Sequence, residues 1–173
     1  IIILFALISA IICTNIVLFA EPIIIIAYGP EWISAAFYLE LLSIASFFYM
    51  LETFNRMIFK IFNQTDKILK LEIVKKIVQI ITLVFGVYFR NVEMLMWGYI
   101  FTNMFAYICN VWSSRKILTS FSWNEVVRVF FIVLSSLIAF SVIKAILLLY
   151  QLPPLGQLLF LPVFIITFFL LVR

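Results

Sequence analysis

The chain alternates between long apolar runs and short polar connections. Apolar residues dominate six stretches, at about 1–27, 31–62, 66–89, 92–112, 123–150 and 155–172. Each stretch is close to or longer than the roughly 20 residues that a helix needs to cross the core of a bilayer. The pattern therefore predicts an all-α, polytopic bundle of about six transmembrane helices, forming a single transmembrane region without a soluble domain.

Helix-breaking and capping residues support these boundaries. Gly29 and Pro30 separate the first two stretches, because glycine ends a helix well and proline suits the first helical position. Glu31 would then lie in the first turn of the second helix, where the helix dipole favours an anion. Pro22 predicts a kink within the first stretch. Asn91 is placed to cap the fourth helix.

Composition strengthens the membrane prediction and excludes several kinds of function. The chain is 66% hydrophobic and only 12% charged, against roughly half and a quarter in soluble domains. Histidine is absent, and both cysteines, Cys13 and Cys109, lie in apolar runs. We therefore expect no catalytic residue, no metal site and no cofactor, so an enzyme is not the favoured class. The +4 net charge is better explained by membrane topology than by nucleic acid.

The distribution of basic residues predicts the orientation in the membrane. Cytoplasmic connections of membrane proteins are enriched in Lys and Arg. With six spans, ten of the twelve Lys and Arg residues fall on one side of the membrane, and only Arg90 and Lys144 fall on the other. Both ends of the segment are therefore expected in the cytoplasm. The ten are Arg56, Lys60, Lys67, Lys70, Lys75, Lys76, Arg115, Lys116, Arg128 and Arg173.

The third stretch carries polar residues on one helical face. Its uninterrupted apolar part, 77–89, is too short to span, so Lys75 and Lys76 should lie near or within the inner boundary. The polar face would line a cavity in which a lysine attracts an anionic substrate, or it reflects a snorkelling lysine pair and ordinary helix packing. The residues of this face, at spacings of three and four, are Glu72, Lys75, Gln79, Thr82 and Gly86.

The fourth stretch carries small and polar residues every four positions: Gly98, Thr102, Ala106 and Asn110. Such a stripe lets membrane helices approach closely, so helix packing is its default interpretation. A second hypothesis is that Asn103 and Asn110 form hydrogen bonds with a sugar.

Two carboxylates of the second stretch have different predicted roles. Glu40 lies about 12 Å along the helix from Trp32, deep enough to require a partner, a proton or water. It would take part in cation coupling or gating, or form a buried hydrogen bond with Ser or Tyr. Glu52 and Arg56 are spaced as an i,i+4 ion pair, which favours a structural clamp.

Several segments resemble polysaccharide flippases of the multidrug/oligosaccharidyl-lipid/polysaccharide exporter superfamily. Residues 19–32 (FAEPIIIIAYGPEW) are similar to a family segment in which an apolar helix reaches a proline, an aliphatic run, an aromatic-glycine pair and an acidic-aromatic helix start. The helix end at 55–60 (NRMIFK), the polar turn at 63–67 and the helix start at 71–76 (LEIVKK) also match. The resemblance covers about residues 19–120, and the last two helices match by hydrophobicity alone.

This resemblance implies a C-terminal part of a transporter with 12–14 helices in two lobes, in the bacterial inner membrane. The implied partners are the bilayer, a first lobe outside this chain, and the substrate, an undecaprenyl-diphosphate-linked oligosaccharide for O-antigen or capsule synthesis. Arg56, Lys75 and Lys76 would make a cationic cytoplasmic entrance. The acidic Glu40 does not fit a purely cationic lining of the cavity. Glu40 better suits the alternative of a cation-coupled multidrug exporter. A polysaccharide polymerase is the alternative from another class, although the absence of histidine disfavours it.

Overall fold

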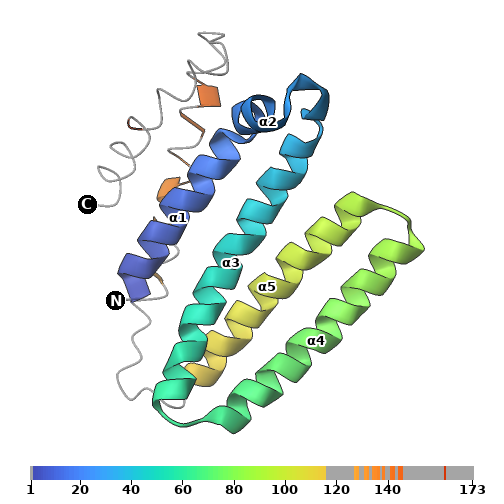
Figure 1. Cartoon of the computed structure of the whole chain (residues 1–173). Helices are drawn as coiled ribbons and strands as arrows, with labels where there is room; N and C mark the ends of the chain where they lie inside the picture. The colour runs from blue at the N-terminus through green and yellow to red at the C-terminus, as the bar shows by residue number, and fades with distance from the viewer. Residues whose placement is uncertain are drawn as a thin grey trace. The chain divides into compact units, whose positions relative to one another are not determined.

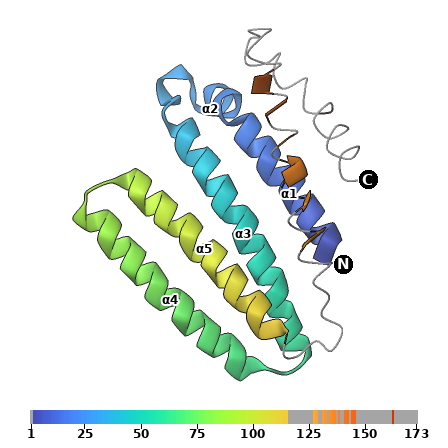
Figure 2. The same cartoon turned by 180° about the vertical axis from the view of Figure 1, so that it is seen from behind.

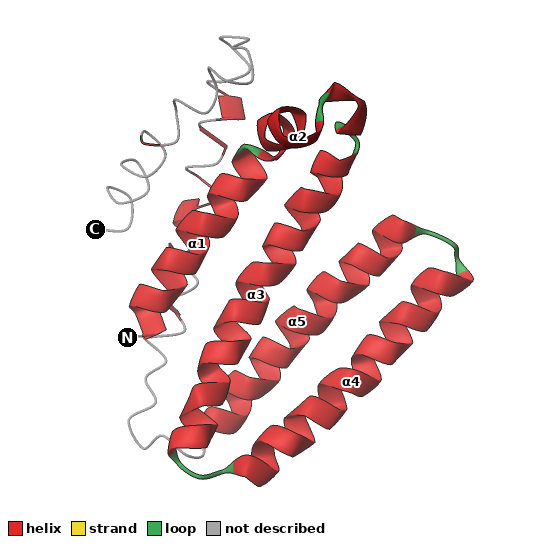
Figure 3. Ribbon diagram, in the orientation of Figure 1, coloured by secondary structure: helices red, strands yellow, loops and turns green. Residues whose placement is uncertain are grey.

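The computed structural model describes residues 2–115, isolated positions between 127 and 145, and position 162. Helices are the regular elements of this described part (Figures 1 and 3). They are α1 (Ile2–Leu18), α2 (Ala20–Tyr28), the 3-10 turn η1 (Pro30–Trp32), α3 (Ala35–Ile61), α4 (Thr65–Tyr88) and α5 (Val92–Ser114). The helices expected at 123–150 and 155–172, with Lys116 and Arg173, lie largely or wholly outside the described residues.

The described chain divides into two compact units, residues 1–43 with 124–173 and residues 44–123. In the first unit, α1 and α2 meet at a bend of 66°. The bend lies at Phe19, not at Pro22 as the sequence predicted. Pro22 lacks the N–H that would reach the carbonyl of Leu18, and its ring crowds that carbonyl, so the helix breaks one turn before the proline. Pro22 itself sits in the first turn of α2, where a missing N–H costs little.

The second expected helix begins later than predicted. Gly29 takes a left-handed φ of 93°, which glycine adopts without strain, and its N–H closes α2 on the carbonyl of Ile25. Pro30 then starts η1, so Glu31 belongs to this short turn and not to the long helix. The continuous helix starts at Ala35 and runs 27 residues, or about 40 Å. Ala36 packs with Ala20 and Ile24 in the core of the first unit.

The second unit contains the C-terminal part of α3 with α4 and α5. In both cartoon views α5 lies between α4 and this part of α3 (Figures 1 and 2). α4 and α5 pack closely because of two glycines. A Cβ added to Gly98 would lie 2.9 Å from the Cβ of Thr82, and one added to Gly86 would overlap Leu95. The stripe predicted on α5 therefore serves helix packing, with Gly98 against α4 and Thr102 and Ala106 buried.

The turns of this unit follow local chemistry. Asn63 adopts a left-handed φ of 52° in the α3–α4 turn, a conformation that asparagine tolerates better than most residues. Asn91 caps α5 as predicted, since its Oδ1 accepts hydrogen bonds from the N–H groups of Glu93 (2.9 Å) and Met94 (3.3 Å). α4 and α5 begin and end within two residues of the bounds expected from the sequence, 66–89 and 92–112.

Among the described helices, α3 is long and apolar enough to cross a membrane. The bent pair of α1 and α2 gives a second such span if the two helices are counted as one. By this criterion of length and composition, the described residues contain one or two spans of the expected six.

Candidate functional site

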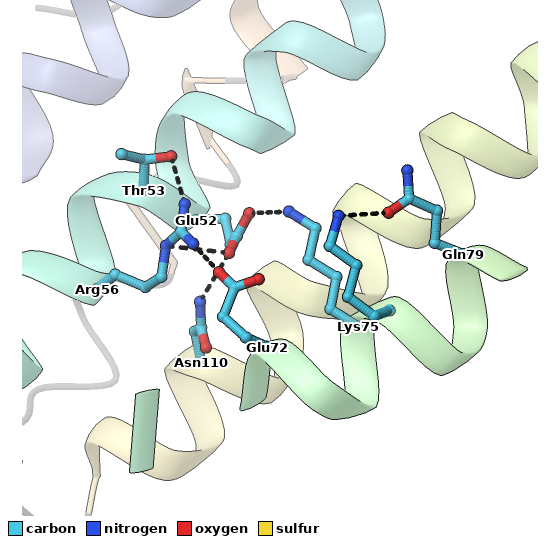
Figure 4. Close-up of polar contacts among 8 residues, drawn as sticks. Glu52, Thr53, Arg56, Glu72, Lys75, Gln79 and Asn110 are labelled. Carbon is cyan, nitrogen blue, oxygen red and sulfur yellow. Dashed lines mark hydrogen bonds and ion pairs between the residues drawn. The ribbon is translucent and has the colours of Figure 1, made fainter. Parts of the chain in front are cut away.

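A buried carboxylate, Glu52, lies at the centre of the polar network in the second unit (Figure 4). Its Oε2 accepts a hydrogen bond from Nζ of Lys75 at 2.6 Å. Its Oε1 faces Nε of Arg56 at 3.3 Å and accepts a hydrogen bond from Nδ2 of Asn110 at 3.4 Å. Glu52 thus joins α3, α4 and α5 through one side chain.

Arg56 extends this network to a second carboxylate. Its Nη1 forms an ion pair with Oε1 of Glu72 on α4, and its Nη2 donates to Oγ1 of Thr53 at 3.2 Å. The acids Glu52 and Glu72 alternate with the bases Arg56 and Lys75 (Figure 4). The four formal charges cancel, so these two cations are neutralised within the protein.

Local spacing explains why these side chains meet. Glu52 and Arg56 are one helical turn apart on α3, and Glu72 and Lys75 are one turn apart on α4, so each helix presents an acid and a base on one face. The tight turn at 62–64 reverses the chain between the two helices. Each acid then lies opposite a base of the other helix.

Burial makes the network costly to leave incomplete. Only 1% of Glu52 and 8% of Lys75 is exposed, and an unpaired buried charge destabilises a protein by several kcal/mol, about 3–5 when one partner of a buried pair is removed. The ammonium of Lys75 also lies 5.2 Å from the centre of the Tyr49 ring, a favourable cation–π distance. Lys75 therefore does not snorkel to a boundary, because its charge is satisfied inside the bundle.

The other sequence-predicted residues of this unit lie apart from the network. Lys76 is exposed, and its Nζ donates to Oε1 of Gln79 at 3.0 Å. Asn110 belongs to the network, but Asn103, two turns earlier on α5, does not. The Asn103 side chain is fully buried, and neither its Oδ1 nor its Nδ2 has a hydrogen-bond partner among the residues that the structure describes. The two asparagines that the sequence grouped as sugar ligands thus have different environments.

Glu40 belongs to the first unit and is half-buried. Lys144 and Glu21 lie within electrostatic range of its carboxylate, the first attracting it and the second repelling it. No hydrogen bond joins Glu40 to a Ser or Tyr within the part of the chain that the structure describes. The interactions of Glu40 that the structure shows are thus electrostatic, with Lys144 and Glu21.

Sequence reasoning missed the central position of Glu52 and the link between Arg56 and Glu72. The i,i+4 spacing predicts a local pair of Glu52 with Arg56 within one helix. It does not indicate Lys75 as a second partner of Glu52. A usable signal was present, because both helices carry an acid and a base one turn apart beside a short connection.

The network has the geometry of a clamp between α3, α4 and α5. Its two cations, Arg56 and Lys75, are held by carboxylates. No group of three or more acidic or cysteine side chains suited to a metal ion occurs among the residues described here. Neither a protein-family model, nor a curated protein, nor a solved structure was found to match the chain.

Proposed function

We propose that this chain is part of a membrane transporter that moves an undecaprenyl-diphosphate-linked oligosaccharide across the cytoplasmic membrane for surface polysaccharide synthesis. The substrate class comes from the resemblance of residues 19–32 and 55–76 to polysaccharide flippases. The membrane part of the proposal is supported by the way in which the second unit distributes its charged and apolar side chains.

The observation that carries the membrane proposal is the contrast between the two faces of α4. Glu72 and Lys75 point into the network, whereas the opposite face exposes large apolar side chains to about half of their surface or more. A soluble monomer rarely exposes so continuous an apolar face. The exposed residues are Ile73, Ile77, Ile80, Ile81, Val84 and Tyr88.

The dimensions of this face fit a bilayer. The segment from Lys70 to Arg90 contains most of α4 and has roughly 20 residues, so it is about 30 Å long. This length equals the thickness of the hydrocarbon core of a bilayer. Two of the charges that make α4 look too polar to span, Glu72 and Lys75, are paired inside the unit. α5 adds exposed Trp97, Phe101, Ile108 and Trp112, and tryptophan is enriched where helices leave the membrane.

The pairing of charges also limits which residues can bind substrate. Arg56 and Lys75 are occupied by carboxylates, so they offer little attraction to a diphosphate. Lys76 and Gln79 remain accessible near the middle of α4, and the buried amide of Asn103 has no partner among the described residues. In this proposal Lys76 attracts the anionic group, and Asn103 accepts or donates hydrogen bonds when hydrated sugar enters.

Deleting the gene that encodes the chain tests the proposal. We expect lipid-linked oligosaccharide to accumulate in the inner membrane and surface glycan to disappear, with both effects reversed by the intact gene. Lys76→Gln should reduce this complementation at normal protein level, and Lys76→Arg should preserve it. Unchanged surface glycan in the deletion strain would refute the proposed substrate.

A cation-coupled multidrug exporter is the second candidate, favoured by Glu40. A half-buried carboxylate near Lys144 and Glu21 suits a group that exchanges its charge partner during transport. Drug sensitivity of the deletion strain with normal glycan, together with loss of drug efflux in Glu40→Gln, would favour this function. Single repeat units on the surface without polymer would instead indicate a polymerase.

A further inference from the structure

The α3–α4 turn carries a cluster of cations that the buried network does not neutralise. Lys60, Lys70 and Lys76 are exposed and Lys67 is half-buried. None of these lysines forms an ion pair with another residue of 2–115. Asp66 is the one carboxylate of the stretch 60–76 that is not engaged by the network, so three net positive charges remain. We refer to residues 60–76 as the basic turn.

Apolar side chains are interleaved with these lysines. Ile61 is 78% exposed, Phe62 48% and Leu69 62%. Exposed aliphatic and aromatic groups at a tight turn are unfavourable in water, because their apolar surface is not buried. Lysine stems and apolar side chains together suit the boundary between acyl chains and headgroups. There the apolar stems lie against the acyl chains, and the ammonium groups reach the phosphates.

We infer that the basic turn binds the headgroups of anionic phospholipids, with Ile61, Phe62 and Leu69 inserted at the headgroup boundary. Four lysines beside a membrane helix are enough to attract an anionic lipid surface. The neighbouring cations Arg56 and Lys75 take no part, because Glu72 and Glu52 hold them. The inference rests on the membrane placement in the proposed function and does not depend on the transported substrate.

The basic turn also changes the expected position of α3. At about 40 Å, α3 is longer than the core of a bilayer is thick, and a projecting C-terminal end would carry the turn into the cytoplasm. With Ile61 and Phe62 at the headgroup boundary, the turn instead remains in contact with the bilayer. Lys70 then marks the level at which the apolar face of α4 begins, one turn before Ile73.

A tryptophan placed in the turn tests the binding. The four native tryptophans are replaced by phenylalanine and Phe62 by tryptophan, and the full chain is reconstituted in phosphatidylcholine vesicles. Brominated phosphatidylglycerol and brominated phosphatidylcholine then compete to quench the reporter. We expect phosphatidylglycerol to be preferred by about fivefold or more, since a lysine near an anionic surface contributes about that factor.

Substitution of Lys60, Lys67 and Lys70, whose side chains have no hydrogen-bond partner within residues 2–115, should remove the preference. In Lys60→Gln/Lys67→Gln/Lys70→Gln the ratio should fall to about one, whereas the corresponding triple Arg variant should retain it. Arg90→Gln removes an exposed cation at the other end of α4 and is the matched control, with no expected change. If the triple Gln variant does not fold, salt provides the test, since screening should lower the preference of the reporter chain itself.

Each contrary result has a separate meaning. A reporter that neither brominated lipid quenches would overturn both the inference and the membrane placement of the turn. Equal quenching by the two lipids, or a preference that survives in the triple Gln variant, would overturn lipid binding and leave the membrane placement intact. Failure of the surface-glycan experiment would change the substrate and would not affect this result.

Discussion

Removing one partner of the Glu52–Lys75 pair gives the sharpest test of the buried network. Lys75→Met deletes the ammonium at 2.6 Å, but Glu52 keeps Arg56 and Asn110. We therefore expect a loss of about 3 kcal/mol, the lower end of the range for breaking a buried pair. Glu52→Met should cost more, about 4 kcal/mol, because it leaves a buried ammonium and an amide without their acceptor.

The double variant separates a true pair from two independent sites. If the effects simply added, Glu52→Met/Lys75→Met would lose about 7 kcal/mol. We expect about 4 kcal/mol instead, because contacting residues couple by up to about 3 kcal/mol. The apolar replacements also remove the cost of holding two charges away from water, which favours the double variant further.

The measurement is equilibrium unfolding of the full chain in mixed micelles, followed by helical circular dichroism. Lys76→Met is the control, since this lysine is exposed and its Nζ donates to the uncharged side chain of Gln79 at 3.0 Å. Its expected effect is within about 0.5 kcal/mol. The reasoning would be refuted if the double variant lost the sum of the single losses, or if Lys76→Met cost as much as Lys75→Met.

Three further predictions concern α5. Asn91→Ala should lower the free energy of unfolding by about 1 kcal/mol, because the N–H groups of Glu93 and Met94 lose their cap. Asn91→Asp, which keeps the acceptor, is the control, and an Ala variant of unchanged stability would contradict the cap. Gly98→Ala should lower the free energy of unfolding by about 1–3 kcal/mol in the same assay, because the added Cβ would lie 2.9 Å from the Cβ of Thr82. A neutral result would show that α4 and α5 separate freely. Asn103→Leu should leave stability unchanged or raise it, because the amide is buried and has no hydrogen-bond partner within the described part of the chain. If Asn103 also contacts substrate, the same variant loses complementation of surface glycan at normal protein level, and full complementation would remove Asn103 from the site.

The sequence determined the features that depend on neighbours along the chain. The bounds of α4 and α5, the Asn91 cap and the Gly98 stripe follow from helical periodicity and from a polar side chain that reaches its own backbone. The Glu52–Arg56 pair is of the same kind, because one helical turn brings i and i+4 together whatever the rest of the fold does.

Only the tertiary structure decided which distant groups meet. Glu52 reaches Lys75 across 23 residues and Asn110 across 58, and such contacts depend on the rotation and register of each helix, which no local pattern encodes. The family resemblance implies a cationic entrance with Arg56 and Lys75, and helix packing sets each of these cations beside a carboxylate of the other helix. The predicted position of the bend, Pro22 in place of Phe19, was wrong for a related reason. The missing N–H of Pro22 acts one turn away, on the carbonyl of Leu18, so the residue that causes the bend is not the residue at which the helix breaks.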